Sequence, residues 1–326
     1  MVREDELIER VRRRLPSAGR GLSVGIGDDA AVLRPGAGTD WVVTTDAFLE
    51  NVHFLRKTHP PNAVGYKALA RATSDIAAMG ARARYFFLTV GLPDACTGAW
   101  LDGFLDGMGR AARRFDMVLA GGDTTKYAAV VASLTVVGEI DRGKAILRSG
   151  ARPGDLLCVS GRLGEAELGL RLIQRKLHKQ KRWAGLLKKH LYPQPRLALG
   201  EWLATHRHTT SMIDTSDGLS TDLGHICKAS GVGAIVWGHK IPGVKIPPDL
   251  RRLGLDPLHL ALDGGEDYEL LFTMPKKFPS RLPRKFKGIP ITVIGEVTSK
   301  REVVLVGADG ARTPLKPKGW DPFRGK

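Results

Sequence analysis

Residues 65–80 read GYKALARATSDIAAMG, and this stretch predicts a helix that ends at Gly80. At helical spacing Asp75 shares one face with alanines and a methionine, so its carboxylate is expected to face the interior. A buried carboxylate without a partner either costs several kcal/mol or becomes protonated. We therefore expect a partner for Asp75, and the pattern allows either a cation cluster or a salt bridge to Lys67 or Arg71.

Further aspartates lie in short, turn-rich or apolar stretches rather than on charged faces: Asp28, Asp29, Asp46, Asp123, Asp214 and Asp217. Carboxylates placed in this way repel one another unless a cation holds them. Mg²⁺ takes oxygen ligands and binds phosphates together with carboxylates. The set therefore predicts a site for several Mg²⁺ ions with a polyphosphate between them.

The chain is long enough for two domains with hydrophobic cores, with 326 residues, of which 43% are hydrophobic and 26% charged. Cys96, Cys158 and Cys227 lack the spacing of a zinc site or a disulfide framework, so we expect buried free thiols. Residues 1–15 predict an amphipathic helix, no apolar run approaches the roughly 18 residues of a membrane span, and no signal peptide is evident. We expect a cytoplasmic protein with no membrane contact.

The net charge of +16 comes from 50 Lys and Arg residues against 34 Asp and Glu residues. The basic residues concentrate at residues 10–14, in an expected Lys-rich helix at residues 171–189 and near the C-terminus, without interleaved aromatics or a known nucleic-acid module. We interpret them as a solvated basic surface that can draw in anionic substrates, and nucleic-acid binding is not expected.

Apolar runs and helical periodicity divide the chain into two halves. The turn-rich stretch 141–154 predicts a boundary between domains at 1–143 and 150–326. The first half is expected to have strands at 41–45, 85–90, 117–120 and 130–137, with helices at 61–79 and 100–115. The second half is expected to have strands at 156–160, 234–237, 268–273, 291–296 and 303–306, with helices near 163–177, 195–204 and 219–229.

Three motifs in the first half place acids beside glycines or strand ends. GIGDDAAV at 25–32 imitates a dinucleotide fingerprint, but no clear strand precedes it and its two acids would repel a pyrophosphate, so a metal-directed or plain Gly-Asp turn fits better. WVVTTD at 41–46 delivers Thr44, Thr45 and Asp46 at a strand end, where oxygen donors suit Mg²⁺. GGDTT at 121–125 predicts a loop after a strand, which either holds phosphate through backbone amides or is a simple turn.

Other polar residues have two readings each. His53, next to Phe54, is either a core histidine or a substrate contact, and Arg148 is either a surface residue or a clamp for nucleotide phosphate. In MIDTSDGL at 212–219, Asp217 or Ser216 could cap the next helix, which leaves Asp214 unexplained. In DGGEDYEL at 263–270, Glu266 could face a substrate from a glycine bend, whereas Glu269 is expected to point to solvent.

Together these motifs resemble the thiamine-monophosphate kinase family, in order and spacing, from about Asp5 to Trp320. The segments that carry the resemblance are GIGDDAAVL, TTDAFLENVHF, GYKALARATSDIAAMGA, GGDTT, LRSGARPGD, PQPRLALG, IDTSDGL, DGGEDYELLFT and IGEV. The resemblance implies an α/β plus α+β, two-domain aminoimidazole ribonucleotide synthetase-like fold, whose N-terminal sheet forms a barrel across a homodimer. It also implies ATP and several Mg²⁺ ions in a cleft between the domains.

The resemblance also implies roles for single residues. Metal ligands, direct or through water, would be Asp29, Thr44, Thr45, Asp46, Asp75, Asp123, Asp214 and Asp217. ATP contacts would be Gly122, Asp123, Arg148 and Ser216, and substrate contacts would be His53, Glu266 and Trp320. The chain departs from the usual pattern at Asn51, where the family has Gly, and at Ala72-Thr73, beside Ser74, where it has Asn.

The reaction implied is direct, in-line transfer of a phosphoryl group from ATP to thiamine monophosphate, assisted by several Mg²⁺ ions and without a covalent phospho-enzyme. Two alternatives stay open. One is another ATP-dependent enzyme of the same superfamily that acts on a different small molecule. The other is a basic nucleic-acid-binding protein that kept the fold, although such a protein has no use for the acidic set.

Overall fold

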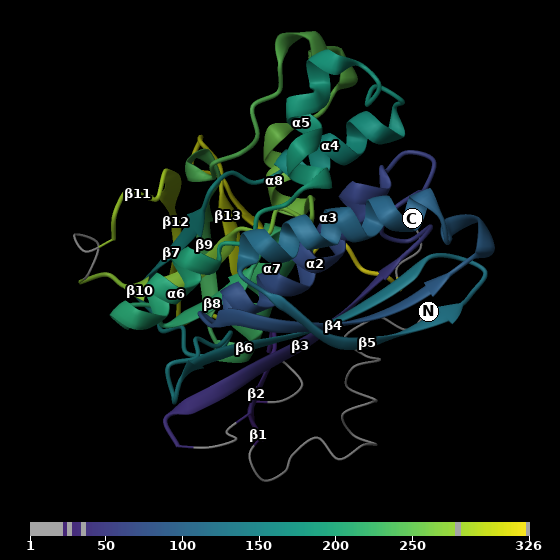
Figure 1. The fold of residues 1–326 in the computed structure, drawn as a ribbon. Coiled ribbons are helices and arrows are strands. Elements are labelled where there is room, and N and C mark those ends of the chain that lie inside the picture. Colours follow the sequence, from purple (N-terminus) through teal and green to yellow (C-terminus); the bar gives the residue numbers. More distant parts are fainter. Residues whose placement is uncertain (1–21, 25–27, 34–36, 278–281, 324–326) are drawn as a thin grey trace.

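The structure is a computed structural model that describes residues 22–24, 28–33, 37–277 and 282–323. The expected N-terminal amphipathic helix lies outside the described residues. Two β-sheets lie side by side, with helices packed on both (Figure 1). Within the described residues, no helix is both long and apolar enough to span a membrane.

The first sheet has the strand order β1-β2-β3-β6-β4-β5, in which β4 and β5 pair in parallel and the other neighbours are antiparallel. One face is covered by two helices that lie together above it (Figure 1), because alternate residues of β4 and β6, together with Val42 and Phe48 of β3, are apolar and buried. The elements are β1 Leu22–Val24, β2 Ala31–Leu33, β3 Thr39–Leu49, α2 Pro61–Ala78, β4 Arg82–Leu92, α3 Ala99–Phe115, β5 Val118–Lys126 and β6 Val131–Asp141.

The second sheet has the strand order β14-β13-β9-β12-β7-β10-β8, with β11 paired to β12. Strands β7 and β10 and the edge strand β8 are buried on both faces by helices and neighbouring segments. Its strands are β7 Asp155–Ser160, β8 Ser211–Asp214, β9 Gly233–Trp237, β10 Leu270–Pro275, β11 Lys285–Phe286, β12 Ile289–Thr298, β13 Val303–Val306 and β14 Arg312–Pro314. Its helices are α4 Glu165–Gln174, α5 Ala184–Leu191, α6 Leu197–His206, α7 Leu219–Ser230 and α8 Pro257–Asp263.

Helix α2 is the element that joins the two halves. It packs on the first sheet and on α3, and its last turn enters a second apolar cluster in which Ala77 and Ala78 join Leu203 of α6 and Phe272 of β10. The connection after β6 is also fixed, because the amide of Ile146 donates to the carbonyl of Met79 at 3.1 Å. The two halves therefore share one continuous packed boundary.

Several sequence expectations are confirmed and others are corrected. The helices expected at 61–79 and 100–115 match α2 and α3, and the three cysteines are buried free thiols. The GGDTT stretch is not a loop after a strand, because β5 continues through it to Lys126. A short strand, β1, precedes Gly25 where none was expected.

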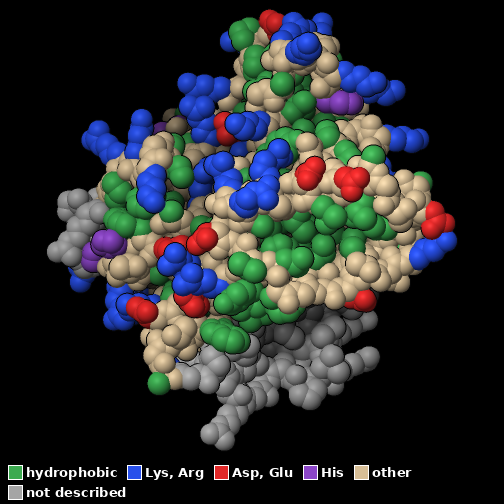
Figure 2. All heavy atoms as spheres, viewed as in Figure 1, with side chains coloured by type: hydrophobic (Ala, Val, Ile, Leu, Met, Phe, Trp, Pro, Cys, Tyr) green, Lys and Arg blue, Asp and Glu red, His purple; other side chains and the backbone are tan. Residues whose placement is uncertain are grey.

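The Lys-rich stretch 171–189 is not one helix. Helix α4 ends at Gln174, and α5 begins at Ala184 after a short 3-10 turn at Lys181–Trp183. Lys and Arg side chains gather over this part of the surface at the top of the view in Figure 2. Most of these side chains are exposed, as a solvated basic surface requires.

Gly107 allows α3 to approach α2 closely. A Cβ added at Gly107 would lie 1.9 Å from the carbonyl oxygen of Asn62 in α2, a distance that requires the helices to move apart. Gly109, on the same helix, has only the flexible end of the Arg113 side chain near it, at 3.4 Å.

We expect Gly107→Ala to lower the free energy of unfolding by about 2 kcal/mol, because overpacking of a closed helix contact costs about 1–3 kcal/mol. Gly109→Ala is the matched control and should stabilise α3 slightly through the higher helix propensity of alanine. Denaturant titrations followed by circular dichroism measure both. Equal stabilities of the two variants would contradict the close approach.

Candidate metal and phosphate site

Three carboxylates meet at the boundary between the two halves. One oxygen each of Asp29, Asp75 and Asp214 lies within 4.8 Å of the other two. Asp29 lies two residues before the start of β2, Asp75 lies in the last turn of α2, and Asp214 ends β8. The first half of the chain thus contributes Asp29 and Asp75, and the second half contributes Asp214. The sequence predicted such a site, shared between acids of both halves.

The electrostatics of this group, which we call the acidic triad, favour a cation. Burial, followed by the charges of neighbouring aspartates, raises the pKa of Asp214 to about 7 and that of Asp75 well above its ordinary value. Within the described part of the chain, Asp29 Oδ2 and Asp214 Oδ2 are buried without a hydrogen-bond partner. Unpartnered carboxylate oxygens in a close group are the donor set that Mg²⁺ takes, so the residues fit the expected metal.

Two residues brace the triad. Thr44 Oγ1 donates to Asp75 Oδ2 at 2.6 Å, so the hydroxyl delivered by β3 orients the acid on α2. Arg148 forms an ion pair with Asp29, and its backbone amide donates to Asp28 at 3.2 Å. Burial and then the charge of Asp29 raise the pKa of Asp28 to about 6. Arg148 is therefore a partly buried counter-ion of the acidic pair and not a surface arginine.

The two salt-bridge partners considered for Asp75 are paired elsewhere. Arg71 donates to both oxygens of Asp46, at 2.7 and 3.1 Å, and Lys67 donates to Glu266 at 2.7 Å. The surroundings of Asp75 are therefore other acids and one hydroxyl, which favours the cation cluster over the internal salt bridge.

The loop after β8 brings four of the predicted site residues together. The amide of Trp320 donates to the carbonyl of Asp217 at 2.9 Å, and the amide of Glu266 donates to the carbonyl of Ser216 at 2.8 Å. All three segments therefore meet beside Asp214, at the C-terminal end of β8.

The expected cap of helix α7 by Asp217 or Ser216 is wrong. Gly218 occupies the N-cap position, and the carboxylate of Asp222, in the first turn, accepts from the amides of Asp217 and Gly218 at 3.3 and 3.0 Å. Neither Ser216 nor Asp217 is the N-cap of this helix. Sequence reasoning missed Asp222, although an acid in the first helical turn was the signal for it.

Three further metal and ATP candidates, Thr45, Gly122 and Asp123, lie on strands β3 and β5 of the first sheet. Thr45 points to the opposite face of β3 from Thr44, and its hydroxyl accepts from Thr135 at 3.2 Å. Asp123 lies in the exposed strand β5 and accepts from the amide of its neighbour Thr124 at 2.8 Å. Gly122 is required for packing, because a Cβ there would lie 1.9 Å from the Leu88 carbonyl. Their predicted roles stay predictions.

His53 lies next to the site in a mostly apolar setting. Its ring stacks on Phe48, with 5.6 Å between centroids, and its Nδ1 accepts from the amide of Leu49 at 3.0 Å. Burial, followed by the charge of Arg71, lowers the pKa of His53 to about 4, so the imidazole is neutral. Asn51, where the resembling family has Gly, adopts a φ of 66°, a conformation that asparagine tolerates better than most residues.

The second departure from the family pattern faces away from the site. Thr73 is buried, and its hydroxyl donates to the carbonyl of Leu69 at 2.7 Å and contacts the sulfur of Met117 at 3.4 Å. This side chain therefore belongs to the packing of α2 rather than to the substrate-contact region.

Glu266 is held by side chains from both halves. Besides Lys67, which lies on α2, the ring of His190 on α5 approaches the same carboxylate oxygen at 3.2 Å. Burial alone would raise the pKa of Glu266, but Lys67 and His190 hold it well below its ordinary value. The carboxylate is therefore charged and fixed, at a position that closes the loop beside Ser216.

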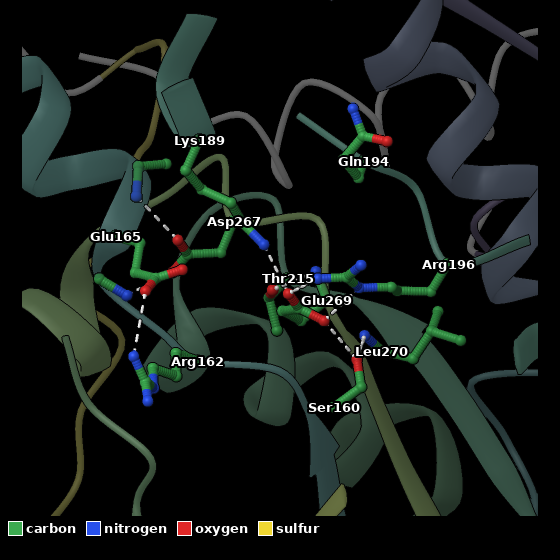
Figure 3. Close-up of polar contacts among 12 residues, drawn as sticks. Ser160, Arg162, Glu165, Lys189, Gln194, Arg196, Thr215, Asp267, Glu269 and Leu270 are labelled. Carbon is green, nitrogen blue, oxygen red and sulfur yellow. Dashed lines mark hydrogen bonds and ion pairs between the residues drawn. The ribbon is translucent and has the colours of Figure 1, made fainter. Parts of the chain in front are cut away.

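Glu269 does not point to solvent, so that expectation is wrong. It is fully buried, and Figure 3 shows Lys189, Arg196 and Ser160 directed at its carboxylate. Arg196 Nε and Ser160 Oγ donate to the same oxygen at 2.6 and 2.5 Å. Asp267, two residues earlier, accepts from the amide of Ala166 at the start of α4 at 2.9 Å. The loop that carries Glu266 is thus anchored on a rigid base.

We expect Glu269→Gln to lower the free energy of unfolding by about 3 kcal/mol, because it leaves Lys189 and Arg196 without their buried anion. Glu302→Gln, at an exposed position, is the control. Denaturant titration measures both, and a stability change in Glu269→Gln no larger than in the control would refute the anchoring role.

The raised pKa of Asp214 predicts how stability changes with pH. Its folded pKa is about 7 against an ordinary 3.8, so between these values the folded state binds more protons than the unfolded state. The contribution of Asp214 to the free energy of unfolding therefore falls as pH rises through this range. In EDTA, we expect Asp214→Asn to gain stability relative to the unsubstituted protein between about pH 5 and about pH 8.

With Mg²⁺ added, the unsubstituted protein should become more stable than Asp214→Asn, because the cation stabilises only the folded protein that binds it. Thermal denaturation with and without Mg²⁺ measures the effect, and Asp106→Asn, at an exposed position on α3, is the control. A stability difference between Asp214→Asn and the unsubstituted protein that does not change with pH would argue against the repulsion in the triad.

Comparison with known proteins identifies the fold and the family of this chain. Residues 27–140 match the model of the AIR synthase related protein, N-terminal domain, and residues 152–307 match that of the C-terminal domain. The chain is 38% identical over 327 residues to thiamine-monophosphate kinase of Escherichia coli (strain K12), with 98% of each chain covered. It is 34% identical over 310 residues to the Bacillus subtilis (strain 168) enzyme, with 93% of this chain and 94% of that protein covered.

The solved structure of AaThiL complexed with AMPPCP and TMP superposes on this chain with a TM-score of 0.86 at 31% identity, covering 99% of this chain and 97% of that chain. The two-domain AIR synthase-like fold of mixed α/β character is thereby established. Both the identity and the coverage extend over nearly the whole chain, and the chain belongs to the thiamine-monophosphate kinase family.

Proposed function

We propose that this protein transfers a phosphoryl group from ATP to thiamine monophosphate and produces thiamine diphosphate and ADP. The observation that carries the proposal is the acidic triad, in which, among the described residues, one buried oxygen each of Asp29 and Asp214 has no hydrogen-bond partner and could bind a cation. The similarity to AaThiL, whose structure holds TMP and the ATP analogue AMPPCP, supports the choice of substrates.

The acceptor needs no strong base, because its attacking atom is a phosphate oxygen that is already ionised near neutral pH. The barrier that the protein must lower is the repulsion between two phosphate-bearing anions. Bound Mg²⁺ neutralises phosphate oxygens and supports in-line transfer. Within the chain, the acidic triad would hold the metal, and Thr44 keeps Asp75 aimed at it.

The other site residues surround this centre in the proposal. Thr45, Asp46, Asp123 and Asp217 complete the metal shell directly or through water, while Gly122, Asp123, Arg148 and Ser216 contact ATP. His53, Glu266 and Trp320 contact the thiamine moiety. The meeting of the Ser216, Glu266 and Trp320 segments beside Asp214 supports this division.

We also propose that the protein is a homodimer in which the first sheets of two copies form a barrel. Within the described residues, the face of this sheet opposite α2 and α3 exposes Trp41, Tyr85 and Phe87 by 46%, 50% and 41%, and β5 is exposed along its length. Exposed aromatic groups on a sheet favour burial against a partner. Gly122 and Asp123 lie in β5, so their contacts with ATP would depend on that pairing.

The predicted domains, 1–143 and 150–326, and the cytoplasmic location remain part of the proposal. Separate apolar clusters on the two sheets support the boundary. Three buried thiols, none in a disulfide, suit a reducing compartment.

We expect the purified protein to release ADP from ATP and Mg²⁺ when thiamine monophosphate is the acceptor. Asp75→Asn should reduce turnover by at least about 100-fold, because it removes a charge from the metal site. The fold should persist, since the substitution relieves repulsion. A coupled ADP assay measures turnover, with exposed Asp106→Asn as control.

Free thiamine and aminoimidazole-type precursors serve as competing acceptors in the same assay. Turnover with one of these in place of thiamine monophosphate would assign the protein to another reaction of the superfamily. Full activity of Asp75→Asn would remove the triad from the mechanism.

A further inference from the structure

Helix α2 carries a line of charged side chains at helical spacing. Lys67, Arg71 and Asp75 are four residues apart and therefore lie on one face. The last of them joins the acidic triad, and the first pairs with Glu266. Arg71 thus stands between the metal site and a predicted substrate contact.

Arg71 is held in place by two residues of β3. Its guanidinium donates to both oxygens of Asp46, and its Cζ lies 5.4 Å from the centre of the Phe48 ring. Asp46 and Phe48 are two residues apart on one face of the strand, so both contact the guanidinium at the same time. With a side chain only 16% exposed, Arg71 is a fixed and largely desolvated cation.

The pair with Asp46 conflicts with the proposed use of Asp46. A carboxylate whose two oxygens both accept hydrogen bonds from a guanidinium is a poor ligand for a metal ion at the same time. When Asp46 turns to the metal, Arg71 becomes a buried cation without an anion, which is costly. Its packing on Phe48 keeps it inside the site, so a new anion must come to it.

We propose that Arg71 binds the phosphate group of the acceptor, which replaces the carboxylate of Asp46 as the partner of the guanidinium. This inference rests on the proposed function and assigns a further substrate-binding residue to it. The planar fork of arginine matches two oxygens of a phosphate as well as two oxygens of a carboxylate. Arg71 would therefore distinguish a phosphorylated acceptor from its unphosphorylated form.

The surroundings of Arg71 point to the acceptor rather than to ATP. After burial, the charge of Arg71 is the next cause of the lowered pKa of His53, and the same charge opposes the effect of burial on the pKa of Tyr268. The charge of Glu266 in turn favours the protonated guanidinium of Arg71. His53 and Glu266 are the residues proposed for the thiamine moiety. The other arginine of the site, Arg148, pairs with Asp29 of the triad rather than with Asp46 and is the one proposed for ATP.

The test is a comparison of ligand affinities by isothermal titration calorimetry in the presence of Mg²⁺ and AMPPCP, which prevents turnover. Thiamine monophosphate and thiamine are titrated into the unsubstituted protein, Arg71→Gln and Arg71→Lys. Arg110→Gln is the matched control, because the Arg110 guanidinium also lies over aromatic rings, 4.9 Å from that of Tyr192, but on exposed α3.

We expect Arg71→Gln to weaken thiamine monophosphate binding by about 10- to 100-fold, the range for loss of a charge-assisted hydrogen bond. Binding of thiamine should be unchanged. Arg71→Lys, which keeps the charge but loses the fork, should fall between the two. Mn²⁺ binding measured by electron paramagnetic resonance without nucleotide should be no weaker in Arg71→Gln, because Asp46 is released.

Each opposite result has a distinct meaning. If Arg71→Gln binds thiamine monophosphate as tightly as the unsubstituted protein does, the inference fails and the proposed function stands. Equal loss of affinity for thiamine and its monophosphate, or weaker Mn²⁺ binding, reduces Arg71 to a structural role and also overturns it. If the unsubstituted protein does not bind thiamine monophosphate, the proposed function fails and takes this inference with it. If Arg71→Gln does not fold, the affinities of Arg71→Lys for thiamine monophosphate and thiamine are compared with those of the unsubstituted protein instead.

Discussion

Mutual repulsion among the carboxylates of the acidic triad is the constraint on which the rest of the structure depends. Asp29, Asp75 and Asp214 come from a turn, a helix and a strand, and nothing local keeps them within 4.8 Å. The packing that surrounds them does so. Helix α2 is buried against the first sheet, α3 and α6, so Asp75 cannot withdraw, and β8 is fixed between β10 and the linker after β6. Hydrophobic burial thus stabilises an arrangement that electrostatics alone would disperse.

Other acids of the fold have partners that neutralise their carboxylates or donate hydrogen bonds to them. Glu269 has two cations and a hydroxyl, Glu266 has Lys67 and His190, and Asp46 has Arg71. The triad has three carboxylates and one ion-paired arginine, Arg148, in a chain with a net charge of +16. Cations are abundant in this protein, so their scarcity at the triad is a local property of the fold. Such a site keeps capacity for a ligand at a cost in stability, as functional sites commonly do.

The sequence predicted those parts of the site that depend on local pattern. Helical spacing identified α2 and the inward face of Asp75, and the short motifs identified Asp29 and Asp214. Contacts between distant segments could not be predicted. Glu269 was misplaced because its partners Lys189 and Arg196 precede it by 80 and 73 residues, and alternation near a strand start does not fix which face is buried.

The same limit applies to the pair of Arg71 and Asp46. Arg71 was considered as a partner for Asp75, four residues away on the same helix, whereas the fold gives it to Asp46 on β3, 25 residues away. The break in the Lys-rich stretch was missed for a different reason. Lysine and arginine favour helix throughout 171–189, but residues 175–180 turn away so that α5 can bring Lys189 to Glu269.

If Arg71 exchanges Asp46 for the acceptor phosphate, metal and acceptor binding are coupled through one side chain. Metal binding at Asp46 would release the guanidinium that the acceptor needs, and acceptor binding at Arg71 would release the carboxylate that the metal needs. By thermodynamic reciprocity each ligand must then strengthen the other by the same factor. The coupling needs no movement of the domains, because Asp46 and Phe48 lie on one strand and Arg71 on a helix packed against it. A single exchange of ion-pair partners would therefore favour the site with both metal and acceptor bound over the site with only one of them.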